Sequence, residues 1–141
     1  MCAGAGKIPV QTNLNIIKTG SIENERIMSL FFSALDFYVM PSFQEAFAQT
    51  PLEAMACGAP VVAFPCSGTK DLINNSNGVI CDDFTVDSLY QGIMKAMETS
   101  YNPDEIRQDV IKRFSPLVIA QQYVDVYRRM LDVNNSVNQH D

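Results

Sequence analysis

Short apolar runs alternate with helical patterns along most of this chain. Residues 13–18 alternate polar and apolar side chains, as a half-buried strand does, and residues 24–35 place apolar side chains at helical spacing. Buried strands are expected at 36–40, 61–64 and 79–81. Short strands that alternate with helices are typical of parallel sheets. The sequence therefore predicts an α/β fold, a Rossmann-like parallel sheet flanked by helices.

The helix that follows the 36–40 strand has the clearest start signal. Thr50 is predicted as its N-cap, Pro51 as its first helical residue and Glu53 as the partner that completes a capping box. Gly58 is expected to end this helix in the left-handed conformation. A further short helix is predicted at 70–74.

The rest of the pattern is helical. Three helices are predicted, which begin after Thr85, Asn102 and Ser115 and run to about Glu98, Arg113 and residue 133. The last helix carries an apolar stripe that consists of Ile119, Tyr123, Val126, Tyr127 and Met130. We find no repeat and no linker, so we expect one domain over 1–133 and a polar, disordered tail over 134–141.

Composition excludes several functions. The chain is 47% hydrophobic and 18% charged, as compact domains are, and its net charge is −6 without a basic cluster, which argues against nucleic-acid binding. No apolar run approaches the roughly 20 residues of a membrane span. The four cysteines (Cys2, Cys57, Cys66 and Cys81) lack C-x-x-C spacing and are interpreted as buried apolar residues in a reducing cytoplasm.

The only histidine is His140, in the polar tail. Serine or cysteine nucleophile pairs and most catalytic zinc sites need a positioned imidazole, which a chain end of this kind does not provide. Any chemistry is therefore expected to use carboxylates, backbone amides or groups of the bound substrate.

The loop at 41–49 is the best candidate for a site. It follows the carboxyl end of a predicted strand, where ligands bind in open α/β sheets, and it leads into a helix N-terminus, which attracts phosphate. Glu45 and Glu53 stand on either side of that terminus and could accept hydrogen bonds from sugar hydroxyls. The alternative is that Glu53 only caps the helix and Glu45 is only a solvated charge, and local pattern alone favours this alternative.

The segment Glu45-Ala46-Phe47-Ala48 is followed by Leu52-Glu53-Ala54-Met55-Ala56-Cys57-Gly58-Ala59-Pro60-Val61-Val62. Together they resemble the E-x7-E signature of the retaining glycosyltransferase family 4, with seven residues between the two glutamates. The resemblance extends back to Asn13 and forward to Tyr127. It implies the partial C-terminal, donor-binding half of a GT-B fold, in an enzyme that transfers a sugar from a nucleotide-sugar with retention of configuration. Polysaccharide or glycoconjugate biosynthesis is the expected setting.

The resemblance also implies roles for residues. The counterpart of Glu53 holds the ribose, and that of Glu45 lies beside the sugar, where it either orients hydroxyls or stabilises the transition state. The backbone at Ala46, Phe47 and Ala48 would face the diphosphate and sugar. Gly20 and Ile22 would line the base. No metal or cofactor is implied, and the acceptor, a saccharide or a lipid-linked saccharide, would bind through a separate N-terminal domain.

The chain departs from the family pattern at several points. Relatives carry glycine where this chain has Ala46 and Ala48, and the family's Arg and Lys diphosphate clamp has no counterpart, because Lys7, Lys18 and Arg26 do not match its context. We therefore expect the isolated chain to be inactive. A non-catalytic nucleotide-binding fragment and a GT-B epimerase or phosphorylase remain alternatives, although the last two need histidine or lysine constellations that are absent here.

Two expectations concern association. The family's first two strands are absent from the predicted set, so the 13–18 strand is expected to pair with the 36–40 strand instead. In relatives the last helix packs towards the N-terminal domain, so its Tyr123, Tyr127 and Met130 face is expected to be bare here. This apolar stripe and an open sheet edge both favour self-association.

Overall fold

Three short parallel strands form the centre of the computed structural model, which describes residues 2–3 and 15–137. The strands β3 (Tyr38–Met40), β4 (Val61–Ala63) and β5 (Gly78–Ile80) pair in the order β3-β4-β5. The register places Val39, Val62 and Val79 side by side. The predicted α/β fold with a parallel sheet is therefore confirmed, and each strand lies one or two residues from its predicted bounds.

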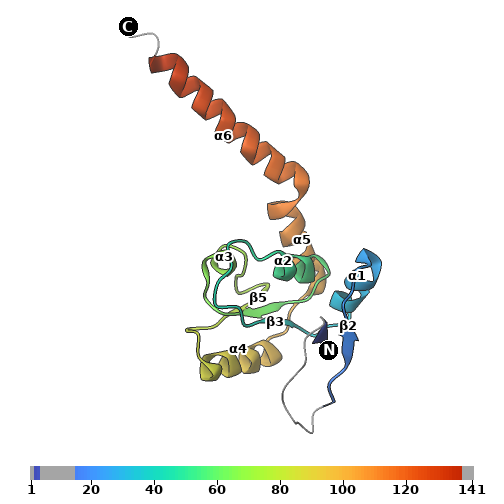
Figure 1. Ribbon diagram of the computed structural model, residues 1–141. Helices are drawn as coiled ribbons and strands as arrows, with labels where there is room; N and C mark the ends of the chain where they lie inside the picture. The colour runs from blue at the N-terminus through green and yellow to red at the C-terminus, as the bar shows by residue number, and fades with distance from the viewer. Residues whose placement is uncertain (1, 4–14, 138–141) are drawn as a thin grey trace. The chain divides into compact units, whose positions relative to one another are not determined.

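Helices cover both faces of this sheet. Figure 1 shows α4 (Val86–Glu98) on one face and α2 (Gln49–Ala56) on the other. The α4 face holds a core cluster of Val62, Phe64, Val79, Cys81 and Ala96. Gly92 permits the close approach of α4, because a Cβ there would lie 2.9 Å from the Cys81 sulfur. Two of the cysteines predicted as buried, Cys66 and Cys81, are indeed buried, whereas Cys57 is half-buried.

The strand predicted at 13–18 is placed differently. Strand β2 covers Lys18–Gly20, residues 15–17 are not in a strand, and residues 13–14 lie outside the described residues. β2 pairs in parallel with β1 (Cys2–Ala3), so the predicted pairing with β3 is wrong. The reason is that the first residues supply a parallel partner, which satisfies the backbone groups of β2 without β3.

β3 keeps an edge to which no described strand is paired. A cavity of about 730 Å³ lies beside β3 and is lined by α1 (Glu25–Ser33) together with residues of the segment 34–41 and Thr50. Phe31, Phe32 and Phe37 are among its walls. The sheet of the described residues is therefore open and apolar on the β3 side.

The start of α2 also differs from the prediction. The helix begins at Gln49 with Ala48 as N-cap, and no side chain makes a cap hydrogen bond, so the capping box at Thr50 is wrong. The amide of Leu52 donates to the carbonyl of Ala48 (3.3 Å), which starts the helix two residues earlier than expected. Pro51 is tolerated because a first-turn residue needs no N–H donor.

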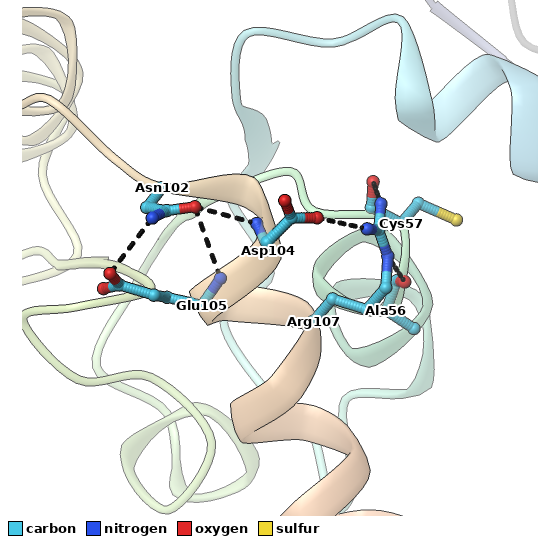
Figure 2. Close-up of polar contacts among 6 residues, drawn as sticks. All are labelled: Ala56, Cys57, Asn102, Asp104, Glu105 and Arg107. Atoms are coloured by element: carbon cyan, nitrogen blue, oxygen red, sulfur yellow. Dashed lines mark hydrogen bonds and ion pairs between the residues drawn. The ribbon is translucent and has the colours of Figure 1, made fainter.

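A side chain of a later helix, α5, holds the C-terminal end of α2. Gly58 adopts the predicted left-handed conformation (φ +89°). Arg107, in α5 (Pro103–Phe114), donates from Nε to the carbonyl of Ala56 (3.2 Å) and from Nη2 to that of Cys57 (3.3 Å), as Figure 2 shows. Its third nitrogen, Nη1, contacts Asp104 at 2.8 Å. The positive charge of Arg107 thus lies at the C-terminal, negative end of the α2 dipole.

The caps predicted at Thr85 and Asn102 are present, and Asn24, for which no cap was predicted, also caps its helix. Asn24 accepts from the amide of Ile27 at the start of α1, and Thr85 accepts from that of Ser88 (3.2 Å) at the start of α4. Asn102 Oδ1 accepts from the amide of Glu105, and its Nδ2 donates to the Glu105 carboxylate (3.0 Å; Figure 2). These three helices begin where short-range capping predicts.

Two helices depart from their predicted bounds. The short helix expected at 70–74 is α3, Ser67–Lys70. It forms earlier because the buried Thr69 hydroxyl contacts the carbonyls of Phe64 and Cys66, both at 2.8 Å. The helix α6 spans Pro116–Val137 and so includes 134–137 of the predicted tail, since extending a helix costs less than starting one. Residues 138–141 lie outside the described residues.

By internal contacts the chain divides into two compact units, residues 1–107 and 108–141, whereas the sequence pattern predicted no division before 133. The boundary falls within α5. The sheet, its flanking helices and all candidate site residues belong to the first unit.

Candidate functional site

The loop between β3 and α2 carries Glu45 and is held from α3. The Glu45 carbonyl accepts from the amide of Gly68 (3.0 Å) and from the hydroxyl of Ser67 (3.1 Å). A Cβ at Gly68 would lie 2.8 Å from that carbonyl oxygen and 3.1 Å from the Ala46 carbonyl carbon. Glycine is therefore required there by the close approach of the two backbones.

The charges of Glu45 and Glu53 both affect the pKa of Tyr38. Burial raises the pKa of the Tyr38 hydroxyl above its ordinary value, and the charges of Glu45 and Glu53 raise the pKa further. An electrostatic effect of this kind requires short separations. Both glutamates thus lie within electrostatic range of Tyr38, the first residue of β3.

A first cavity, of about 440 Å³, brings together two of the predicted donor-binding residues. Ile22 and Glu53 both line it, along with residues 23–25 and parts of α1 and α2. In its wall the hydroxyl of Ser29 lies 3.6 Å from the sulfur of Cys57. Gly20 is not among its lining residues. Gly20 has a φ of +73° and open space around it, so backbone conformation alone accounts for glycine there.

A second cavity, of about 610 Å³, holds Glu45 and Ala46 and shares no lining residue with the first. Phe47 and Ala48 line neither cavity. The Phe47 side chain is 55% exposed, and Ala48 is buried at the start of α2. Within the described residues the Glu45 carboxylate has no hydrogen-bond or ion-pair partner.

The N-terminus of α2 lies in sequence between the residues of the two cavities. No side chain caps it, but the Gln49 N–H donates to the Phe47 carbonyl (3.0 Å) and Pro51 has no N–H, so the Thr50 N–H is the first-turn donor available to a ligand. Among the described residues no residue other than glycine has a positive φ, so Ala46 and Ala48 fit this loop without backbone strain. An anion placed here would meet the Thr50 N–H and the positive end of the helix dipole.

Two residues of the site were not singled out from the sequence. Ser67 had no role in the prediction, and Gly68 only falls within the stretch, from Asn13 to Tyr127, over which the resemblance extends. A local signal for them is weak, because both act on a carbonyl more than twenty positions earlier in the chain. Only the fold brings them to the Glu45 loop.

Solved structures share this fold. The chain matches sucrose-phosphate synthase of Thermosynechococcus elongatus with a TM-score of 0.66 and 26% identity, over 83% of this chain and 30% of the synthase. It matches HepE of Anabaena, solved in complex with UDP and glucose, with a TM-score of 0.60 and 21% identity, over 80% and 32% of the two chains. The fold is that of a partial GT-B domain.

Sequence comparison identifies the family. The model of the glycosyl transferases group 1 matches residues 10–113, and the chain belongs to this family. An uncharacterized glycosyltransferase of Methanocaldococcus jannaschii is 28% identical over 123 residues, which are 84% of this chain and 31% of the relative. The chain thus spans about a third of the length of such relatives. Among the described residues no helix is both long and apolar enough to cross a membrane.

Proposed function

We propose that the chain is the donor-binding part of a retaining glycosyltransferase, which transfers a sugar from a nucleotide-sugar to an acceptor in polysaccharide or glycoconjugate biosynthesis. The observation that carries the proposal is the uncapped N-terminus of α2, with Glu45 before it and Glu53 within the helix. A diphosphate suits the Thr50 N–H and the positive end of the α2 dipole, and the two carboxylates suit the hydroxyl groups on either side of a diphosphate.

The two cavities suggest how the donor lies. The nucleoside would occupy the cavity of Ile22 and Glu53, with Glu53 accepting from the ribose hydroxyls. The transferred sugar would lie beside Glu45, whose carboxylate would either orient sugar hydroxyls or stabilise positive charge that develops at the anomeric carbon. HepE was solved with UDP and glucose, and a uridine nucleotide is therefore the first donor to test.

Calorimetric titration of the chain with UDP and with GDP tests the assignment. Glu53→Ala is expected to weaken binding by about 1.5–3 kcal/mol, because it removes a hydrogen bond to a charged acceptor, and Glu45→Ala is expected to weaken it less. Glu98→Ala, at the exposed end of α4, is the matched control. Equal affinities for all three variants, each shown to be folded, would overturn the site assignment.

A transfer assay separates an enzyme from a nucleotide-binding module. We expect the isolated chain to bind nucleoside diphosphate without measurable sugar transfer, since no Arg and Lys clamp stands in the family context to stabilise the leaving diphosphate. Turnover by a monomeric sample would show that other residues replace the clamp. Absence of nucleotide binding would contradict the proposed function itself.

A further inference from the structure

Three phenylalanines from separate segments meet beside Glu45. Phe43 and Phe84 are stacked, with ring centroids 5.8 Å apart and an interplanar angle of 21°. Phe64 lies beneath both, with centroid distances of 5.5 Å to each. Phe64 is buried, but Phe43 is 66% exposed and Phe84 is 41% exposed. The buried Phe64 thus contacts both Phe43 and Phe84, while much of the surface of these two side chains faces solvent.

This aromatic surface belongs to the second cavity, which Phe43 and Phe84 line together with Gln44, Glu45 and Ser67. Exposed ring surface next to an amide, a carboxylate and a hydroxyl suits a ligand with one apolar face and a rim of hydroxyl groups. The C–H groups of a pyranose ring can lie on an aromatic face, while its hydroxyl groups donate to the carboxylate and the amide. No lining residue of this cavity is cationic, and Glu45 disfavours an anionic ligand.

Sheet order separates this surface from the nucleoside cavity. Phe64 directly follows β4 and Phe84 comes after β5, whereas the first cavity is built by α1 and α2, and α1 leads into β3. Because the strands lie in the order β3-β4-β5, a donor that extends from Glu53 towards Glu45 points towards the aromatic surface. If the transferred sugar lies beside Glu45, a ring stacked on Phe43 and Phe84 would be next to it, at the reacting end of the donor.

We infer that Phe43 and Phe84 form a stacking platform for a neutral pyranose ring of the acceptor saccharide. This inference rests on the proposed function and adds to it the chemical class of the acceptor. A neutral hexose unit is favoured over a uronic acid or a phosphorylated sugar, because the latter two would place negative charge beside Glu45. Glu45 would then help both to receive the acceptor and to exclude charged competitors.

Ligand-observed NMR on the full chain tests the platform. The probes are methyl α-glucoside, methyl α-mannoside and methyl α-glucuronide, each with UDP present and absent. Both neutral glycosides are expected to bind more tightly than the glucuronide, and Glu45→Gln is expected to reduce that difference. Phe43→Leu and Phe84→Leu are each expected to reduce the affinity for the neutral glycosides about 3- to 10-fold, the range that aromatic contacts provide.

Tyr90→Leu is the matched control, because Tyr90 is an exposed aromatic residue of α4 that does not line this cavity. Retained UDP affinity in the platform variants, with unchanged thermal unfolding, shows that the nucleotide site and the fold are intact. Absence of glycoside binding while UDP still binds would overturn the platform and leave the proposed function standing. Equal losses in Tyr90→Leu and Phe43→Leu, or no loss in either platform variant, would overturn it as well.

Discussion

The amide of Gly68 donates to the carbonyl of Glu45 at 3.0 Å, and the two backbones approach so closely that no side chain fits between them. This contact fixes the position of the Glu45 backbone relative to α3. The position of the candidate catalytic carboxylate therefore depends on a residue with no functional group.

Gly68→Ala is expected to displace the Glu45 loop, since its Cβ would lie 2.8 Å from the Glu45 carbonyl oxygen and backbone cannot move aside as a flexible side chain can. Ser67→Ala removes one hydrogen bond to the same carbonyl without this clash and is expected to cost only about 1 kcal/mol of stability. Affinity for nucleotide-sugar, measured by calorimetry, should fall more in Gly68→Ala. The reverse order would show that the hydroxyl, and not the close approach, holds the loop.

Tyr38 reports on the two glutamates. Its pKa is raised by burial and by the charges of Glu45 and Glu53, in that order. Glu45→Gln and Glu53→Gln are each expected to lower the Tyr38 pKa, the former more. The measurement is the pH titration of phenolate absorbance, with Tyr38→Phe to identify the signal and Glu98→Gln as a control that should not shift it.

The same pKa predicts how stability depends on pH. Below the ordinary tyrosine pKa of 10.0 both the folded and the unfolded state hold the Tyr38 proton, and its contribution to stability is complete. Above that pH the unfolded state releases the proton first, so stability falls as pH rises through the higher pKa of the folded state. Urea unfolding should show a steeper alkaline loss in the wild type than in Tyr38→Phe. Identical alkaline slopes would contradict the raised pKa.

Gly78 is expected to tolerate no substitution. A Cβ there would lie 2.1 Å from the carbonyl oxygen of Val61 on the paired strand, and Gly78→Ala should destabilise the fold by about 3 kcal/mol or more. Gly92→Ala is the comparison, because its new methyl group meets a cysteine sulfur and a valine methyl, and alanine is favoured in a helix by roughly 1 kcal/mol. The thermal unfolding midpoint of Gly92→Ala should be well above that of Gly78→Ala.

Arg107 is expected to stabilise the far end of α2. Arg107→Ala removes two hydrogen bonds to the carbonyls of Ala56 and Cys57, and we expect a loss of about 1–2 kcal/mol. Asp104→Ala, which breaks only the ion pair, should cost less than about 1 kcal/mol because the Asp104 side chain is 86% exposed. If denaturant unfolding showed equal losses of unfolding free energy in Arg107→Ala and Asp104→Ala, the ion pair would account for the effect.

Self-association remains a prediction. Tyr123, Tyr127 and Met130 on α6 are 62%, 63% and 61% exposed, and β3 has an edge without a described strand partner. Light scattering at increasing concentration should show a rising mean mass, and Tyr127→Glu should reduce it more than Gln122→Glu does. A monodisperse monomer at high concentration would contradict the prediction.

Local chemistry accounts for what the sequence predicted correctly. Thr85 and Asn102 cap their helices through hydrogen bonds to amides within three residues, so the pattern that predicts the cap also contains its partner. The same holds for Gly58, whose left-handed conformation follows from the helix that it ends. The roles that the E-x7-E resemblance gives to Glu45 and Glu53 stay predictions.

Non-local contacts account for what the sequence did not predict. β2 is defined by its pairing with Cys2–Ala3, and an alternating pattern at 13–18 gives no information about that partner. The start of α2 was assigned to Thr50 because a capping box is a local signal, yet Ala48, which lacks a capping group, begins the helix. The platform of Phe43 and Phe84 brings together side chains from two strand ends, and only the fold places them in contact.

The order of the strands also bears on how quickly the site forms. Each strand pairs with the next one in sequence, Tyr38 with Val61 and Val61 with Gly78, so each pairing closes one crossover connection. Parallel pairing of this kind is slower than helix or hairpin formation, because the crossover must close before the strand contacts are made. The Glu45 loop and α2 are the connection that closes when β3 meets β4. The Glu45 carbonyl reaches its two donors only when α3, which follows β4, is in place, so the candidate site is complete later than the first strand pair.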